Sequence, residues 1–301
     1  MKTLIYAEVK DGSVIKNSLE LITAAREKGE VLALTNEEAA AEKLAAYTDV
    51  VVYKNAKSTE ALAAALAAEA ETADVLYFPN TLQGRDLAAL TAGKIGAGVV
   101  TDVIEVNGSV YTRPLFGGTV QEEVEAAEGK KVCVSIRGGV YGKPEEKAGS
   151  VTVKEDTFEE NEKQIDQIVE LSEEVNLEEA TIVVAGGRGC GSKEGFALVE
   201  ELAKELGAVV GASRPAIENE WISRAHQIGQ SGKNIAPKLY IACGISGAQQ
   251  HVSGISGADV IVAVNKDADA PIFEMADIGI VGKIEDILPE LIAKIKARKE
   301  A

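Results

Sequence analysis

Aromatic residues and positive charge are both scarce in this chain of 301 residues. Phe, Trp and Tyr make up 4% of it, and 31 Lys and Arg stand against 48 Asp and Glu, which leaves a formal net charge of −17. Proteins that bind nucleic acid present Lys and Arg to the phosphates and aromatic side chains to the bases. The composition therefore argues against a nucleic-acid partner. An acidic surface is typical of a soluble protein and can also steer it toward basic patches on other proteins.

Cysteine and histidine are rare as well. Cys133, Cys190 and Cys243 are odd in number and far apart, and the only histidines are His226 and His251. Neither a disulfide framework nor a zinc site is predicted, and a reducing compartment fits best. Cys190 has no evident activating base in the sequence, so Cys190 and Cys243 are expected to be small buried residues rather than nucleophiles.

Long apolar runs are also missing. No stretch approaches the roughly 18 apolar residues of a membrane span, which predicts no membrane insertion. Residues 1–8 enter a strand-like run at once, without the basic region and apolar stretch of a signal peptide. The chain is therefore expected to be soluble and cytoplasmic. Its length suggests two domains, because a compact domain usually spans about 100–200 residues.

The first half of the chain alternates short β-branched runs with amphipathic stretches rich in Ala, Leu, Glu and Lys. Strands are predicted at residues 3–9, 31–35, 50–54 and 74–79, with helices between them. A more β-rich stretch follows, with strands predicted at 99–106, 110–115 and 131–137. Because parallel strands need crossover connections, the alternation predicts a parallel sheet covered by helices on both faces.

Acidic residues crowd the chain from about residue 155 to 179, where the apolar runs of a sheet core are lacking. This segment is predicted to be a solvated connector with some helix. The α/β rhythm then resumes, with strands predicted at 181–185, 209–211, 239–243, 259–264 and 278–281 and helices at 193–206 and 284–298. The predicted fold class is α/β, with two doubly wound, mostly parallel-sheet domains at 1–179 and 180–301, the first including the acidic connector.

The stretch with the most chemical content is 185–192, Ala-Gly-Gly-Arg-Gly-Cys-Gly-Ser, which lies between a predicted strand and a predicted helix. Glycines let the backbone approach a ligand closely, and a helix start offers unpaired N–H groups to an anion. Arg188 adds a partner for a phosphate or an electron-rich ring. The spacing differs from the Gly-x-Gly-x-x-Gly fingerprint, so this stretch alone fits a structural turn as well as a nucleotide site.

Polar loops follow the other predicted strands of the second domain, at the strand ends where open α/β sheets bind ligands. These loops are Ser213-Arg214, the stretch Gln227-Ile228-Gly229-Gln230-Ser231-Gly232, the stretch Gly244-Ile245-Ser246-Gly247-Ala248-Gln249-Gln250-His251, and Asn265-Lys266-Asp267. Several such loops after successive strands favour one shared ligand site over unrelated turns.

In order and spacing, these loops resemble the FAD domain of electron-transfer flavoprotein α subunits. The resemblance is carried by Gly186-Gly187-Arg188-Gly189, residues 210–214, 227–233, 239–242 and 244–248, Gln250-His251, residues 265–267, and Ala270-Pro271-Ile272-Phe273. It extends over the whole chain and is strongest over residues 180–301. In the first half Thr112-Arg113-Pro114 and residues 134–138 also match, although those motifs are less specific.

The resemblance implies FAD as the cofactor and a set of residues that bind it. These are Arg188, Ser213, Arg214, Gln227, Ile228, Gly229, Gln230, Ser231, Ser246, Gly247, Ala248, Gln250, His251 and Asn265. Positive charge at Arg214 and His251 would stabilise the reduced flavin, which is tuning rather than acid–base catalysis. Lys283 follows Gly282 where many members of the family carry an acidic residue, which leaves a side-chain contact to adenine open at that position.

The function implied is that of a redox carrier. The resemblance implies a heterodimer with an electron-transfer flavoprotein β subunit, which contacts the N-terminal domain. It implies electron transfer from acyl-CoA or related dehydrogenases, as in fatty acid β-oxidation, to an acceptor such as a quinone oxidoreductase. Related flavoproteins bifurcate electrons with a second FAD and NADH, and this sequence fits both roles.

Two other functions remain open from the residues alone. A stand-alone NAD-dependent oxidoreductase would need its own substrate pocket and proton-transfer residues, and neither is visible in the sequence. A nucleotide-binding regulatory module would need neither.

Overall fold

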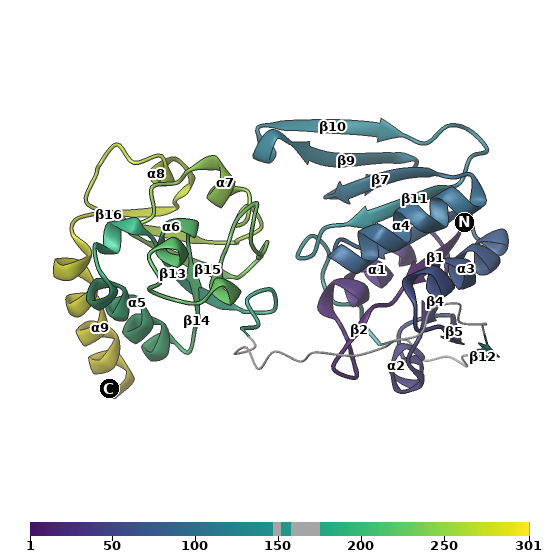
Figure 1. Cartoon of the computed structure of the whole chain (residues 1–301), viewed down its shortest axis with the longest axis horizontal. Helices are drawn as coiled ribbons and strands as arrows, with labels where there is room; N and C mark the ends of the chain where they lie inside the picture. The colour runs from purple at the N-terminus through teal and green to yellow at the C-terminus, as the bar shows by residue number, and fades with distance from the viewer. Residues whose placement is uncertain (147–151, 158–174, 301) are drawn as a thin grey trace. The chain divides into compact units, whose positions relative to one another are not determined.

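The computed structural model describes residues 1–146, 152–157 and 175–300 (Figure 1). The chain divides into two compact units, Met1–Ile168 and Val169–Ala301. They are called unit 1 and unit 2 below. Among the described residues, no helix combines the length and the apolar character that crossing a bilayer requires.

Unit 1 is built on a seven-stranded sheet in which every neighbouring pair is parallel, in the order β12-β5-β4-β1-β6-β11-β7. Its strands are β1 (Lys2–Tyr6), β4 (Glu30–Thr35), β5 (Val50–Asn55), β6 (Val75–Pro79), β7 (Gly98–Val103), β11 (Val132–Ile136) and β12 (Thr152–Thr157). Alternate residues of one strand enter different cores: Leu4 packs in one apolar cluster and Ile5 in the other. The sheet is therefore buried on both faces, as its apolar strands predict.

Four helices of unit 1 cover these two faces. They are α1 (Lys16–Arg26), α2 (Glu38–Leu44), α3 (Thr59–Glu69) and α4 (Leu82–Ile95). Leu62 of α3 and Leu87 of α4 share a cluster with Leu4, whereas Leu21 of α1 and Leu44 of α2 share the other cluster with Ile5. Figure 1 shows these helices beside the strands of the parallel sheet.

An antiparallel sheet extends unit 1 beyond the parallel one. It consists of β8 (Glu105–Asn107), β9 (Val110–Leu115) and β10 (Val120–Glu125), in the order β10-β9-β8, and a small hairpin is formed by β2 (Val9–Lys10) and β3 (Ser13–Val14). Strand β10, Val-Gln-Glu-Glu-Val-Glu, was not predicted from the sequence. Its side chains are mostly exposed, so it lacks the apolar run that marks a buried strand.

The acidic stretch differs from the predicted connector at both ends. Residues 152–157 form β12, which pairs in parallel with β5, although a connector was expected from about residue 155. At the other end, Leu177 is fully buried in a core cluster of unit 2. The remainder of the predicted connector, residues 158–174, lies outside the described residues.

Unit 2 has a five-stranded parallel sheet in the order β14-β13-β15-β16-β17. Its strands are β13 (Ile182–Gly186), β14 (Val209–Ala212), β15 (Leu239–Cys243), β16 (Ile261–Asn265) and β17 (Ile278–Val281). Two long helices, α5 (Lys193–Leu206) and α9 (Ile284–Glu300), pack together over one face, where Lys296 pairs with Glu201 at 2.8 Å. The second core cluster of unit 2 contains Ile228, Tyr240 and Ile255.

Short helical turns connect several strands of unit 2. They are α6 (Arg214–Glu218), α7 (Gln249–Val252) and α8 (Ile272–Met275), together with the 3-10 turns η3 (Arg188–Cys190) and η4 (Arg224–His226). The α/β class and the mostly parallel sheets predicted from the sequence are confirmed in both units.

The strand order of unit 2 determines where a ligand can enter. Numbered within the unit, the strands lie in the order 2-1-3-4-5, so the direction of winding reverses between β13 and β15. In doubly wound sheets the loops diverge at this reversal and leave a crevice at the carboxyl ends of the strands. The loops after β13 and β15 are the two glycine-rich stretches of the sequence.

Candidate functional site

The glycine turns after β13 and β15 are in direct backbone contact. The N–H of Gly187 donates to the Cys243 carbonyl at 2.9 Å, and the N–H of Gly189 donates to the Gly244 carbonyl at 2.8 Å. A Cβ on Gly187 would lie 2.6 Å from the Gly244 oxygen, and a Cβ on Gly189 would lie 2.7 Å from the Gly244 Cα. Side chains are therefore excluded here, and the two turns form one rigid floor at the reversal point.

The cysteines beside this floor are buried thiols. Cys190 and Cys243 are both buried and free, and the Cys190 thiol lies 3.6 Å from the Cys243 carbonyl oxygen. Burial raises the pKa of Cys190 to about 11 and also raises that of Cys243. A thiol with such a pKa stays protonated near neutral pH, so the prediction that these residues are buried rather than nucleophilic fits the structure.

Two arginines stand at the ends of β13 and β14. Arg188 opens η3 with an exposed side chain. Arg214 begins α6 and pairs with Glu218 at 2.8 Å, with side chains 70% and 59% exposed. Ser213, directly before it, is buried, and its N–H donates to the Gly186 carbonyl at 3.0 Å. The two guanidinium groups are thus available to an anionic ligand, although Arg214 has an acidic neighbour.

The loop 227–231 is fastened to two other elements. The N–H of Ile228 donates to Ala212 of β14 at 2.9 Å, and the N–H of Gln230 donates to the Gln250 carbonyl at 2.7 Å. Gly229 has a φ of +122°, and a Cβ there would lie 2.5 Å from the same Gln250 oxygen. Within the loop, the Gln227 amide donates to the Ser231 hydroxyl at 2.8 Å. The loop is therefore held in one conformation against β14 and α7.

The turn after β15 is fixed from its other side by Asn265. The side-chain amide of Asn265 donates to the Ile245 carbonyl at 2.9 Å, and its carbonyl accepts from the Asp267 N–H at 3.1 Å. Gly247 has a φ of +85°, and a Cβ there would lie 2.2 Å from the Ile272 nitrogen. Asn265 is itself buried, so in this structure it orients the turn at 244–247 rather than standing open to a ligand.

His251, the third residue of α7, is buried, unlike the residues that precede it in the helix. His251 is only 6% exposed, whereas Gln250 before it and Ser246 and Ala248 in the preceding turn are exposed. Its Nε2 lies 2.7 Å from the Tyr240 hydroxyl. Burial lowers the pKa of His251 to about 4, and the nearby backbone of Ile228 does not offset this. His251 is thus neutral at pH 7, which differs from the positive charge expected at this position.

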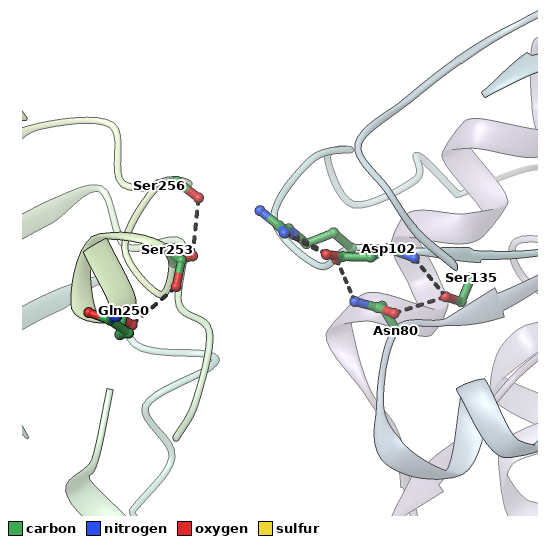
Figure 2. Close-up of polar contacts among 7 residues, drawn as sticks. Asn80, Asp102, Ser135, Gln250, Ser253 and Ser256 are labelled. Atoms are coloured by element: carbon green, nitrogen blue, oxygen red, sulfur yellow. Dashed lines mark hydrogen bonds and ion pairs between the residues drawn. The ribbon is translucent and has the colours of Figure 1, made fainter. Parts of the chain in front are cut away.

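Two serine hydroxyls just after α7 donate hydrogen bonds to backbone carbonyls three residues earlier in the chain. Ser253 donates to the Gln250 carbonyl at 3.1 Å, and Ser256 donates to the Ser253 carbonyl at 3.3 Å (Figure 2). The Gln250 carbonyl therefore accepts from both Ser253 and the loop residue Gln230. This oxygen joins α7 to the loop 227–231.

Tyr240 is the residue of this region that the sequence analysis missed. It lies inside β15, and its hydroxyl is the group that the His251 ring contacts. A usable signal was present, because a tyrosine in a buried strand normally needs a hydrogen-bond partner for its hydroxyl. Lys283, the residue left open in the sequence, follows β17 next to Gly282, whose N–H donates to the Asn265 carbonyl at 2.9 Å.

Unit 1 carries a separate polar network at the carboxyl ends of β6, β7 and β11. Asp102 accepts two bonds from Arg137 at 2.9 and 2.7 Å and a third from Asn80 at 2.7 Å (Figure 2). Ser135 accepts from the Asp102 N–H and donates to the side-chain oxygen Oδ1 of Asn80. Because these groups satisfy one another, the network ties three strand ends together. In the described part of the chain, no group of three His, Cys, Asp or Glu residues is placed to hold a metal ion.

The fold and the two glycine turns define a class. A parallel sheet in the order 2-1-3-4-5, with glycine turns meeting where the winding reverses, is a doubly wound α/β domain of the kind that binds ligands such as nucleotides in that crevice.

Comparisons with known proteins narrow that class. Residues 176–256 match the family described as "Electron transfer flavoprotein FAD-binding domain", and residues 3–161 match "Electron transfer flavoprotein domain". The electron transfer flavoprotein subunit alpha of Mycobacterium tuberculosis strain H37Rv is 40% identical over 99% of both chains. The subunit alpha of Thermoanaerobacterium thermosaccharolyticum is 38% identical over 98% of both chains. "Protein FixB" of Clostridium saccharobutylicum is 37% identical over 97% of this chain and 95% of its own length.

The chain therefore belongs to the electron transfer flavoprotein α-subunit family and carries the FAD-binding domain of that family. The residues in unit 2 fit such a cofactor. The glycine floor at the reversal point leaves room for a ligand backbone to approach, two exposed arginines suit an anionic group, and the buried Nδ1 of His251 has no partner among the described residues.

Proposed function

We propose that this chain is the FAD-holding subunit of a two-subunit electron carrier, which accepts electrons from a dehydrogenase and delivers them to a separate acceptor. The observation that carries the proposal is the joined pair of glycine turns at the reversal point of unit 2, within the segment that matches the FAD-binding family. When bound, FAD supplies the ring that takes up and releases electrons.

The protein residues have three separate tasks in this proposal. Arg188 and Arg214 present positive charge to the cofactor from the ends of β13 and β14. Ser213, the loop 227–231 and the turn 246–248 line the cofactor with hydroxyl, amide and backbone groups. Asn265 acts through the turn at 244–247, which it holds by its amide bond to Ile245.

Proton transfer is not a task that the two histidines can perform readily. His251 is buried with a pKa lowered to about 4, and Nδ1 of His226 lies 2.7 Å from the Val210 carbonyl oxygen. A general base must reach a substrate proton with a pKa near the working pH. A carrier of electrons needs no such base, whereas a stand-alone NAD-dependent oxidoreductase does, and this favours the carrier.

The partners follow from the family as proposals. The β subunit would complete the heterodimer through unit 1. The dehydrogenase would be one that acts on acyl-CoA or a related substrate, as in fatty acid β-oxidation, and the acceptor a quinone oxidoreductase or similar protein. We propose a cytoplasmic location for the complex. A bifurcating complex with a second FAD in the β subunit is a variant of the same proposal.

The test is co-expression of this chain with an electron-transfer flavoprotein β subunit from the same organism, followed by identification and counting of bound flavin. We expect a yellow heterodimer with one FAD, which an acyl-CoA dehydrogenase and its substrate reduce. Two FAD molecules per heterodimer, with reduction by NADH, would select the bifurcating variant. A colourless protein that binds NAD or ATP but no flavin would contradict the proposal and favour an oxidoreductase or a regulatory module.

A further inference from the structure

A hydrogen bond between the sheet and α7 sets the state of the buried histidine in unit 2. The Tyr240 hydroxyl and Nε2 of His251 are 2.7 Å apart, and their rings lie 6.2 Å apart between centroids at 44°. Tyr240 is fully buried, and His251 is 6% exposed. Nδ1, the other ring nitrogen, is buried without a hydrogen-bond partner among the described residues.

The protonation of both groups limits how this bond can be made. Burial raises the pKa of the Tyr240 hydroxyl well above its ordinary value, so the tyrosine keeps its proton. Burial also lowers the pKa of His251 to about 4, so the imidazole carries one proton at pH 7. A neutral imidazole has one donor nitrogen and one acceptor nitrogen. Only two arrangements remain.

The number of buried donors and acceptors left without a partner distinguishes these two arrangements. If Nε2 carried the proton and donated to Tyr240, both the tyrosine proton and the Nδ1 lone pair would lack partners. If Tyr240 donates to Nε2, only the Nδ1–H remains to be satisfied. The second arrangement has fewer unmet polar groups in a buried place, which proteins strongly avoid.

The backbone of Ile228 supports the same choice. Its contact with the ring raises the pKa of His251, which is the effect of an acceptor facing a ring N–H. The contact falls short of a hydrogen bond at Nδ1. Ile228 also belongs to the loop 227–231, which Gln230 fastens to the Gln250 carbonyl beside His251. Nδ1–H is therefore a donor without a hydrogen-bond acceptor among the described residues. It lies close to the loop 227–231 of the candidate site.

We infer that Tyr240 is a positioning residue that fixes His251 as the neutral Nδ1–H tautomer, so that His251 offers bound FAD a hydrogen-bond donor rather than a positive charge. The tautomer follows from the protein alone, whereas the identity of the acceptor rests on the proposed function. In this arrangement Arg188 and Arg214 are the cationic groups of the site. His251 contributes a directional hydrogen bond from a neutral ring.

The test is nitrogen-15 NMR of the histidine rings in the heterodimer with oxidised FAD. The chain has only two histidines, so replacing one of them assigns the signals of the other, and His226→Gln serves for this. In the wild type His226 is also an internal reference, because its Nδ1 lies 2.7 Å from a carbonyl oxygen and must carry the proton. We expect His251 to be neutral at pH 7 and to favour Nδ1–H by about tenfold or more.

Two variants separate positioning from general destabilisation. Tyr240→Phe removes the donor to Nε2, so the Nε2 resonance should shift and the tautomer excess should fall. Tyr77→Phe is the matched control, since it removes a buried tyrosine hydroxyl in unit 1 that has no hydrogen-bond partner among the described residues, and it should leave the His251 signals unchanged. The inference would be overturned by an Nε2–H tautomer, by a cationic ring at pH 7, or by a folded Tyr240→Phe with an unchanged ratio.

The wild-type spectrum decides the tautomer even if Tyr240→Phe does not fold. The outcomes also separate this inference from the proposed function. A purified complex without FAD but with Nδ1–H at His251 would refute the function and leave the tautomer standing. A complex with FAD but with Nε2–H at His251 would refute the tautomer and leave the proposed function standing.

Discussion

At the scale of single residues, the floor of the candidate site consists of glycines whose replacement would displace backbone. Gly244 has a φ of +62°, and a Cβ on it would lie 2.7 Å from the Gly189 carbonyl carbon. Such a contact cannot be relieved by turning a side chain, because both partners are main-chain atoms. The whole turn after β13 or after β15 would have to move.

Gly244→Ala is therefore expected to destabilise unit 2 and weaken FAD binding. Gly207→Ala is a matched control, because Gly207 has a φ of +63° but no atom within 4 Å of the place where a Cβ would lie. The control should lose about 1 kcal/mol for the left-handed backbone alone, and Gly244→Ala should lose about 3 kcal/mol or more. Urea unfolding and flavin retention measure both effects. Equal losses in the two variants would show that the contact with Gly189 has no energetic importance.

Arg214 lends itself to a charge test because it is exposed and has an ionic partner one turn away. Arg214→Gln should lower the flavin midpoint potential by about 20 mV or more, since a positive charge stabilises the reduced ring. Glu218→Gln removes the carboxylate 2.8 Å from the guanidinium, so it should leave the potential unchanged or raise it. Both potentials can be measured by spectroelectrochemistry. An unchanged potential in Arg214→Gln would argue against flavin tuning by this residue.

His251 predicts a pH dependence of stability in unit 2. Its pKa is about 4 in the folded protein and near 6.5 when unfolded, so between these values only the unfolded chain binds the proton. Stability should therefore fall as the pH falls from 6.5 to 4, by about 3 kcal/mol at most. His251→Asn should lack this component, whereas His226→Asn should retain it. Chemical unfolding at several pH values measures it, and identical pH profiles for wild type and His251→Asn would contradict the assignment.

At the scale of elements, Asn265 connects the end of β16 to the turn after β15. Asn265→Ala would remove two hydrogen bonds, a buried one to Ile245 and a partly buried one from Asp267, and should cost about 2–3 kcal/mol together with FAD affinity. Asn219→Ala is the control, because it removes a similar amide-to-carbonyl bond of 2.8 Å at an exposed site. That variant should change stability by about 0.5 kcal/mol or less. Thermal unfolding with and without FAD compares them, and equal costs would show that Asn265 does not hold the turn.

Elements could be predicted from the sequence where local signals mark both ends. Helix α5 was predicted over its observed range, because Ser192 caps its start by accepting from the Gly195 N–H and Gly207 ends it in the left-handed conformation. Strand β12, Thr-Val-Lys-Glu-Asp-Thr, was missed because it is mostly polar and its partner β5 lies far away in the chain. Pairing between distant segments leaves no local signal to read.

The candidate site could be predicted from the sequence only in part, as the elements could. The glycine-rich and polar loops could be assigned to strand ends, and the FAD cofactor that the family resemblance implied is confirmed by the family match. The state of His251 could not be predicted, because it depends on how α7 packs against Tyr240 in β15. The pairing of Arg214 with Glu218 one turn later was visible as a spacing, but its exposure was not.

At the scale of the whole molecule, the described residues form two sets of cores. The apolar clusters of unit 1 and those of unit 2 share no member. Two sets of cores without shared packing can unfold independently, since cooperative unfolding depends on shared packing.

We therefore expect two unfolding transitions in calorimetry of the isolated chain. FAD should raise only the one that belongs to unit 2, by about 2.7 kcal/mol at a free concentration about 100 times its dissociation constant. Tyr77→Phe and Gly244→Ala identify the transitions, because they lie in unit 1 and unit 2 respectively. A single transition that FAD shifts as a whole would show that the two units unfold together.

The contact between the two glycine turns also orders events during synthesis of the protein. Gly187 leaves the ribosome long before Gly244, and its bond to the Cys243 carbonyl cannot form until β15 has emerged and docked beside β13. Newly made chains that end before residue 239 therefore lack half of the floor on which the cofactor would rest. Loading of FAD must wait until most of unit 2 has been translated, so nascent chains pass through a stage in which the crevice has only one wall.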